Sequence, residues 1–197
     1  MTPSSPPSRA IRAAVEAGAR SPCAKSKRGA VIFSETAGRV AIYAAKCNQQ
    51  PQPFVCSGDE RCRAACAKLC THAEQAAILS AVGICGGSTL RGLQLVHAKV
   101  VNRLLVPGGG PSCWQCSRLV LEVALDGVWL YEGPDGRKPE HYQCTACSEV
   151  MTRSSDFEEY QHAGCLGLVE RVGAWRYYTA EDFHRATLAA CGIEVPR

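Results

Sequence analysis

The order of the apolar runs along the chain constrains the fold more than any other feature. Four short runs have the length and composition of strands, and they lie at 29–33, 39–46, 93–101 and 127–132. Two longer stretches, 72–83 and 113–125, have the length and pattern of helices. From residue 29 the order is therefore β, β, α, β, α, β. This alternation predicts an α/β fold in which helices cover both faces of a sheet.

Further elements are expected at the two ends of this pattern. The stretch 11–21 has apolar residues at helical spacing. The stretch 179–192 begins with Thr179 and Asp182, which are spaced as in a capping box, and it ends at a glycine. The following residues, 193–195, are expected to add a last short strand.

Length and composition indicate one globular domain. The chain has 197 residues, of which 46% are hydrophobic and 20% charged, as in ordinary soluble proteins. Residues 1–10 are rich in Pro and Ser and lack the apolar centre of a secretory signal, so we expect a disordered N-terminus. Residues 11–197 then form the single domain, with a Cys-rich insertion at about 132–178. There is no apolar run long enough to span a membrane.

The charge is mildly positive. A net charge of +4 is compatible with an anionic ligand such as a nucleotide, but it is small for a dedicated nucleic-acid binder. The one basic cluster, residues 25–28, is either a solvated face or a contact to phosphate.

The cysteine content is unusual, because the chain has 13 cysteines, an odd and high number for its length. Without an export signal the expected compartment is the reducing cytoplasm, where disulfides are disfavoured. The cysteines therefore indicate metal sites.

Two short motifs combine the residue types of a catalytic zinc site. His72 and Glu74 lie at the start of one expected helix, and Cys113 and Cys116 lie in the first turn of the next. One histidine and two thiolates supply three protein ligands and leave the fourth position to water, as in catalytic zinc sites. Glu74 is not needed as a ligand, so it is available to move protons.

Each motif alone has an ordinary explanation. A His-x-Glu sequence is common, and a Cys-x-x-Cys sequence also occurs in redox sites and in half zinc fingers. The combination favours the catalytic zinc site, because each motif opens a helix in a β-α-β-α order.

Through these two motifs the chain resembles the cytidine and deoxycytidylate deaminase superfamily, whose signature is His-x-Glu followed by Pro-Cys-x-x-Cys. The resemblance covers about 21–131 and extends faintly over 179–195, and it is nearest to deoxycytidylate deaminases. "SPCAKSKRGAVIF" resembles their first strand, and "AAKCNQQPQPFVC" resembles their Tyr-Asn-Gly-x-Pro segment. "CRAACAKLCTHAEQAAIL" resembles their Cys-rich approach to His-Ala-Glu.

The resemblance implies a three-layer α/β/α sandwich with a five-stranded mixed sheet. It implies that His72, Cys113 and Cys116 bind zinc and that Glu74 shuttles protons.

The resemblance also implies two substrate contacts. Asn48 would hydrogen-bond the sugar, although a turn residue is an equal alternative at that position. Lys25 lies near a basic position of the family and would contact a phosphate.

The chain departs from the family at three points. Ser112 separates Pro111 from Cys113, Ala76 replaces an asparagine, and the connection at 97–110 is longer than usual. These departures leave the zinc chemistry intact and leave the substrate open.

A second zinc site is expected inside the insertion. Its ligands would be Cys144, Cys147, His162 and Cys165, whose spacing is that of a structural zinc knuckle. Metal binding would close a segment that has little apolar periodicity. The alternative is that these cysteines are unrelated buried residues.

A further four-ligand site is one of two explanations for the cysteines before His72. They are Cys56, Cys62, Cys66 and Cys70, and the last three repeat every four residues, which indicates a helix. The alternative is a helical stripe of free cysteines packed in the core.

We therefore expect a zinc-dependent hydrolytic deaminase of a cytosine nucleoside or nucleotide. The runner-up is a cytosine or adenine deaminase of single-stranded DNA or RNA, with Trp129, Trp175, Tyr177 and Tyr178 as stacking candidates. A catalytically inactive, zinc-stabilised binding module is the alternative from another class, and the presence of Glu74 speaks against it. We further expect a homo-oligomer and no membrane partner.

Overall fold

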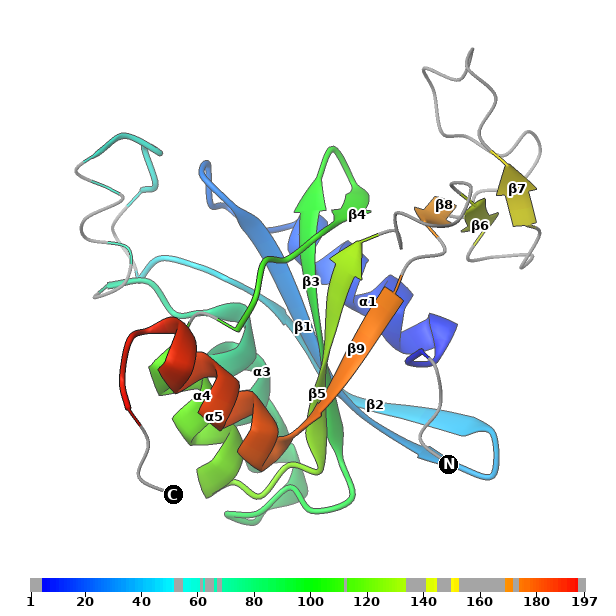
Figure 1. Ribbon diagram of the computed structural model, residues 1–197, viewed down its shortest axis with the longest axis vertical. Coiled ribbons are helices and arrows are strands. Elements are labelled where there is room, and N and C mark those ends of the chain that lie inside the picture. The colour runs from blue at the N-terminus through cyan, green and yellow to red at the C-terminus, as the bar shows by residue number, and fades with distance from the viewer. Residues whose placement is uncertain are drawn as a thin grey trace.

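The computed structural model describes residues 5–51, 55–60, 62, 66, 69–111, 113–133, 141–144, 150–152, 169–171 and 174–194. For 141–144, 150–152, 169–171 and 174 only the backbone is described. The described elements form a mixed sheet with helices on both of its faces (Figure 1). The α/β class expected from the sequence is confirmed.

The central sheet follows the path β2-β1-β3-β5-β9, and a sixth strand, β4, pairs with the end of β3. The strands are β1 (Lys27–Thr36), β2 (Arg39–Cys47), β3 (Gln94–Val101), β4 (Leu104–Val106), β5 (Gly127–Gly133) and β9 (Ala174–Thr179). β3 and β5 are parallel, and all other neighbours are antiparallel. Four of the five strands on the continuous path were expected from the sequence, and the fifth, β9, takes the place of the strand expected at 193–195.

β4 is formed by the long connection that follows β3. Asn102 and Arg103 have positive φ angles of 50° and 64°, the conformation of a tight two-residue hairpin turn. Val101 and Leu104 pair across this turn. The connection at 97–110 therefore folds back onto β3.

β9 lies at the end of the segment that was expected to be an insertion. Two of its aromatic side chains pack against aromatic side chains of β5. The ring centroids of Tyr177 and Trp129 lie 4.9 Å apart, and those of Trp175 and Tyr131 lie 5.2 Å apart. These aromatic pairs stabilise the pairing of β9 with β5 at the edge of the sheet. The last strand expected at 193–195 is not formed by its described residues, 193 and 194.

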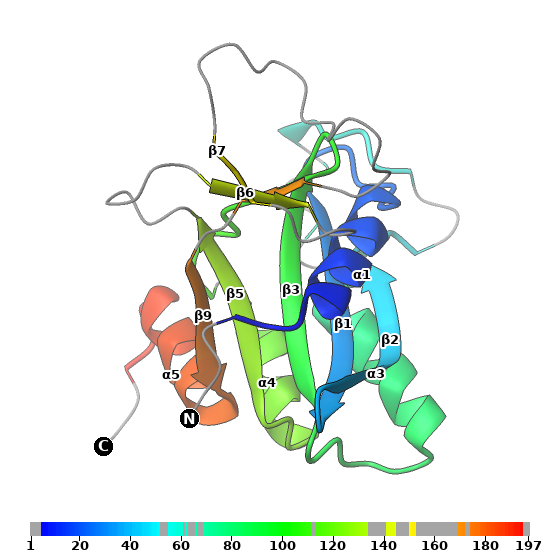
Figure 2. The same cartoon turned by 90° about the vertical axis from the view of Figure 1, so that its right-hand side faces the viewer.

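Helices cover the two faces unequally. α1 (Ser8–Ala19) lies on one face, and α3 (Ala73–Cys85), α4 (Trp114–Glu122) and α5 (Ala180–Ala190) lie on the other (Figure 2). Side chains of β1 alternate between them: Val31 and Phe33 join the core under α1, whereas Ala30 and Ile32 join the core under α3 to α5. The arrangement has three layers.

α3 is longer than its sequence pattern suggested. It continues through Gly83 and ends at Cys85, because Gly86 adopts a left-handed conformation with φ 65° and closes the helix. In the preceding Cys-rich stretch, residues 60, 62, 66 and 69 are helical, and Cys70 N–H donates to Cys66 O at 3.0 Å. The helix expected there is present in the described residues.

A second, small sheet has the order β7-β6-β8, formed by β6 (His141–Cys144), β7 (Val150–Thr152) and β8 (Val169–Arg171). It lies within the segment 132–178. Cys147, His162 and Cys165 of the expected zinc knuckle lie outside the described residues, and only the backbone of Cys144 is described.

The sheet brings the starts of α3 and α4 to one edge. Gly29 near the start of β1 pairs with the last residue of β2 and with Ala98 of β3. Gln49 forms a β-bridge with Thr71, directly before α3. Gly108 N–H donates to Tyr131 O at 3.1 Å and holds the loop that leads to α4. Sites in open α/β sheets typically form where such loops meet.

Candidate metal centre

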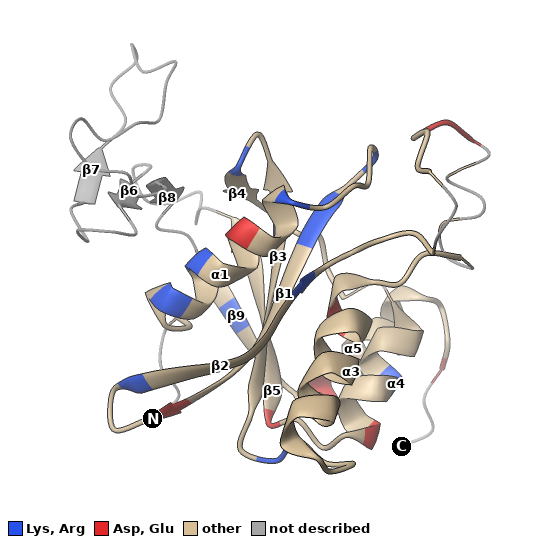
Figure 3. Cartoon of the chain, turned by 180° about the vertical axis from the view of Figure 1, so that it is seen from behind, with Lys and Arg blue, Asp and Glu red and all other residues tan. Residues whose placement is uncertain are grey.

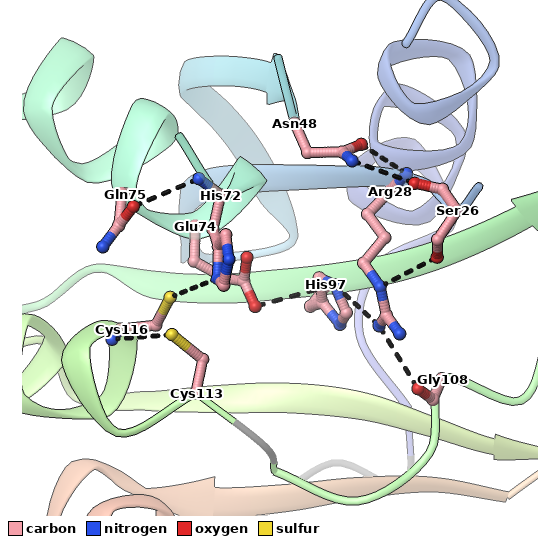
Figure 4. A network of polar contacts seen from close by, with 10 residues as sticks. All are labelled: Ser26, Arg28, Asn48, His72, Glu74, Gln75, His97, Gly108, Cys113 and Cys116. Atoms are coloured by element: carbon pink, nitrogen blue, oxygen red, sulfur yellow. Dashed lines mark hydrogen bonds and ion pairs between the residues drawn. The ribbon is translucent and has the colours of Figure 1, made fainter. Parts of the chain in front are cut away.

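His72 is placed by the start of α3, where it is the residue that caps the helix. Gln75 fixes this turn, because its Oε1 accepts a hydrogen bond from His72 N–H at 3.1 Å. The backbone of His72 is thereby held, and its imidazole points toward the start of α4 (Figure 4).

The two thiols are placed by the start of α4. Cys113 caps this helix, and its Sγ accepts a hydrogen bond from Cys116 N–H at 3.3 Å. Cys116 is fully buried, and its Sγ lies 3.2 Å from His72 Nδ1. The ligand atoms of His72, Cys113 and Cys116 all lie within 4.8 Å of one another, and no other such group occurs among the described residues.

This spacing fits a metal ion. A tetrahedral ion with bonds of about 2.0–2.3 Å to nitrogen and sulfur places its ligand atoms about 3.3–3.8 Å apart. The three expected ligands therefore converge within metal-binding distance, and one nitrogen with two sulfurs is a donor set typical of zinc.

The electrostatics of the three groups also favour a cation. The pKa of Cys113 is lowered to about 5, because the Cys116 thiol and the His72 imidazole donate hydrogen bonds to its sulfur. The Cys113 thiolate, together with burial, raises the pKa of Cys116, and its hydrogen bond raises the pKa of His72. A metal ion must therefore displace protons from Cys116 and His72 in order to bind.

Glu74 lies beside this group without belonging to it. The side chain is largely buried, and its Oε1 lies 3.6 Å from Nε2 of His97 on β3. Burial raises the pKa of Glu74, but His97, the backbone N–H and His72 outweigh it, so the net pKa is lowered. The carboxylate is thus ionised close to the metal ligands.

His97 is a site residue that the sequence motifs did not indicate, and Arg28 belongs to the basic cluster 25–28, for which a contact to phosphate was one of two interpretations. His97 is buried, and burial lowers its pKa despite the nearby Glu74. Arg28 Nη1 lies 3.5 Å from His97 Nε2 and donates to Gly108 O at 3.2 Å. Figure 4 shows His97 between the metal ligands and Arg28. The available signal was a lone histidine inside the apolar run at 93–101.

The Asn48 side chain hydrogen-bonds the segment that leads into β1. Its Oδ1 accepts hydrogen bonds from Ser21 Oγ and Arg28 N–H, both at 2.8 Å, and its Nδ2 donates to Ser26 O at 2.9 Å. These contacts fix the turn into β1, as the turn alternative for this residue suggested. Asn48 also lines the cavity described next.

A cavity of about 420 Å³ opens onto these residues. His72, Glu74 and Cys113 line it, together with three cations, Lys25, Arg28 and Lys99. Glu74 is the one carboxylate among the described lining residues, so the wall carries an excess of positive charge. Figure 3 shows further basic residues along α1 and β1. The size is that of a small-molecule site, and the charge favours an anionic ligand.

The cysteines before His72 line a second cavity, of about 210 Å³, which includes Cys56, Cys62, Cys66 and Cys70 in its wall. The four expected residues therefore border one cavity, but no three of their sulfurs converge as closely as the ligand atoms of His72, Cys113 and Cys116.

Comparison with known proteins does not assign a family, because no protein-family model and no curated protein matches the chain. In the part of the chain that the structure describes, no helix has the length and apolar character needed to cross a membrane.

Proposed function

We propose that the protein is a zinc-dependent hydrolytic deaminase that acts on a cytosine nucleoside or its 5′-phosphate. One observation carries this proposal: His72, Cys113 and Cys116 converge at a cavity wall, and the buried carboxylate of Glu74 lies next to them without completing the ligand set. A purely structural metal site has no need of that carboxylate.

The three ligands suit zinc and leave a coordination position for water. A zinc ion held by them would act as a Lewis acid and lower the pKa of water toward neutrality. The residues of the chain then have to hold the substrate in place and move protons.

Glu74 has the position and the charge for the proton transfers. Its carboxylate accepts the proton that water loses as the water oxygen bonds to C4 of cytosine. The Glu74 carboxyl group then delivers this proton to ring nitrogen N3. In a second transfer it moves the remaining proton of the added hydroxyl to the amine as the C4–N bond breaks. The products are uracil and ammonia. His97 faces Glu74 at 3.6 Å and holds the carboxylate in its place.

The substrate class follows from the size and charge of the cavity. A cavity of about 420 Å³ admits one nucleotide, and Lys25, Arg28 and Lys99 favour a phosphate at its wall. The deoxycytidylate-like resemblance of the sequence supports the same choice.

The aromatic residues do not favour the runner-up, a deaminase of single-stranded nucleic acid. Trp129 is buried, and Tyr177 and Trp175 pack against the rings of β5, so these side chains form core rather than a stacking platform. Tyr178 is also buried.

The direct test is ammonia release by the zinc-loaded protein from cytidine, deoxycytidine, their monophosphates and a cytosine-containing oligonucleotide. We expect release from a nucleoside or a monophosphate. Release from the oligonucleotide alone would establish the runner-up, and zinc binding without release from any cytosine or adenine substrate would favour the inactive binding module.

A further inference from the structure

Five cysteine side chains gather beside the pocket, and the proposed function uses none of them. They come from three parts of the chain: Cys23 precedes β1, Cys56 lies in the loop after β2, and Cys62, Cys66 and Cys70 lie in the partly helical stretch before His72. The sequence pattern had grouped only the last four, so the structure adds Cys23.

The closest sulfur contacts join three of the five residues. No three of the five sulfurs lie within 4.8 Å of one another, so a bound ion would have to draw them closer together. Cys56 Sγ lies 3.3 Å from Cys62 Sγ and 3.8 Å from Cys23 Sγ. Cys66 acts electrostatically on Cys62 and on Cys70, and Cys23 and Cys62 also act on Cys70, so the remaining two thiols lie in the same neighbourhood. Two sulfurs on one tetrahedral ion lie about 3.8 Å apart, so Cys56 and its neighbours already have nearly that separation.

The thiols of the cluster differ in acidity: the pKa of Cys56 is lowered, whereas the Cys56 thiol raises the pKa of Cys62 and burial raises the pKa of Cys70. Ala24 N–H donates to Cys56 Sγ and Ser26 N–H donates to Cys23 Sγ, each at 3.4 Å. Burial raises the pKa of Cys56, but Ala24 N–H, the Cys62 thiol and Gly58 N–H lower it to about 7. Thiolates that accept such hydrogen bonds are good metal ligands.

A buried donor also faces this cavity. Gln50 lines the 210 Å³ cavity with the cysteines, and its buried Nε2 has no hydrogen-bond partner among the described residues. Leaving a buried amide donor unpaired is costly. Deprotonated sulfurs would provide the missing acceptor.

The alternative, that these cysteines are apolar core, agrees poorly with their surroundings. Val55 is 89% exposed and Leu69 is 50% exposed, so the large apolar residues beside the cluster are not buried with it. The segment needs another source of order, which a bound metal supplies in regions short of apolar packing.

We propose that this five-thiol cluster binds one zinc-class metal ion, with Cys56 and Cys62 as two of its ligands and the remaining ligands drawn from Cys23, Cys66 and Cys70. The site is structural, because four thiolates close a tetrahedral ion and leave no position for water. It ties the loop after β2 to the turn before β1. Cys23, Cys66 and Cys70 also line the 420 Å³ cavity, so the ion orders one wall of that cavity.

The test is the metal content of full-length protein by elemental analysis. Cys56→Ser and Cys62→Ser should each remove about one metal ion per chain from the His72→Ala parent, which lacks the other described site. Cys85→Ser and Cys191→Ser are matched controls at exposed cysteines and should leave the content unchanged. Because each variant is compared with its own parent, an ion bound in the segment 132–178 adds equally to both.

A second measurement does not require changes in the cluster. The His72→Ala protein is loaded with Co²⁺, whose sulfur-to-metal absorption grows with the number of thiolate ligands. We expect strong thiolate bands that Cys144→Ser, Cys147→Ser does not abolish. Absence of these bands in that triple variant, or unchanged metal content in Cys56→Ser and Cys62→Ser, would overturn the proposal. So would a Cys56–Cys62 disulfide in protein purified under reducing conditions. The proposal does not depend on deaminase activity, and either one can fail without the other.

Discussion

Lys25 is the residue at which the substrate class can be tested most simply. Its ammonium lines the 420 Å³ cavity, whereas Lys27, two residues later, does not. Because the Lys25 side chain is exposed, we expect the lower part of the range for a lost charge-assisted contact. Lys25→Ala should raise KM for the monophosphate about tenfold and leave KM for the nucleoside unchanged.

Lys27→Ala is the matched control, and steady-state kinetics on the two substrates measure both variants. Equal changes for nucleoside and monophosphate would show that Lys25 does not meet the phosphate. A steep loss of activity with salt would instead indicate contacts to several phosphates, as in a polynucleotide substrate.

At this scale the sequence predicted the residues of local motifs and missed those that act through the fold. His72, Cys113 and Cys116 could be predicted, because each lies at the start of a helix in a short motif whose residues are close together in the sequence. His97 was not predicted, and Arg28 was indicated only as part of the basic cluster 25–28, because the contact between them depends on the pairing of β1 with β3. For Asn48 the sequence left two roles open, a sugar contact and a turn residue. Its hydrogen bonds to Arg28 and Ser26 form only when the end of β2 lies beside the start of β1.

At the scale of elements, α5 contributes to the wall of the pocket through the packing of one aromatic side chain. Phe183 lines the cavity and packs edge-on against Tyr178, with ring centroids 6.1 Å apart. The helix begins at Thr179, whose Oγ1 accepts a hydrogen bond from Asp182 N–H at 3.1 Å.

Thr179→Ala should therefore destabilise the protein by about 0.5–2 kcal/mol, the usual cost of losing a helix cap. Thr179→Ser retains the hydroxyl and should restore most of that stability. Denaturant unfolding of both variants measures the difference. Equal stability of the Ala and Ser variants would show that the cap does not hold α5.

The elements themselves were predictable where a run of residues has one clear period. The strands β1, β2, β3 and β5 and the helices α3 and α4 follow from such runs. β9 did not, because its aromatic residues follow a long Cys-containing segment and are stabilised by pairing with β5. β4 depends on two residues with positive φ, Asn102 and Arg103, which a propensity pattern does not indicate.

At the scale of the whole molecule, a metal ion at His72, Cys113 and Cys116 links α3 to α4 and should stabilise the fold when bound. The pKa values of His72 and Cys116 are raised, so both groups bind protons more tightly than free side chains do, and the ion competes with these protons. Affinity should therefore fall as pH falls, by about tenfold per pH unit for each proton displaced.

Competition titrations with a chromogenic chelator at about pH 8 and about pH 6 measure this dependence. The stabilisation by zinc, followed as a shift in melting temperature, should shrink over the same range. An affinity that is independent of pH would show that the ion does not bind through these groups. The His72→Ala variant supplies the baseline for ions bound elsewhere in the chain.

The central claim is that Glu74 moves protons beside a metal ion that it does not bind. The most direct measurement is ammonia release by Glu74→Gln and wild-type protein at matched zinc content. We predict that Glu74→Gln keeps its zinc and its fold and loses activity by about two to four orders of magnitude, the usual contribution of a general acid–base group. Activity within a few-fold of wild type, at equal zinc content, would contradict the account.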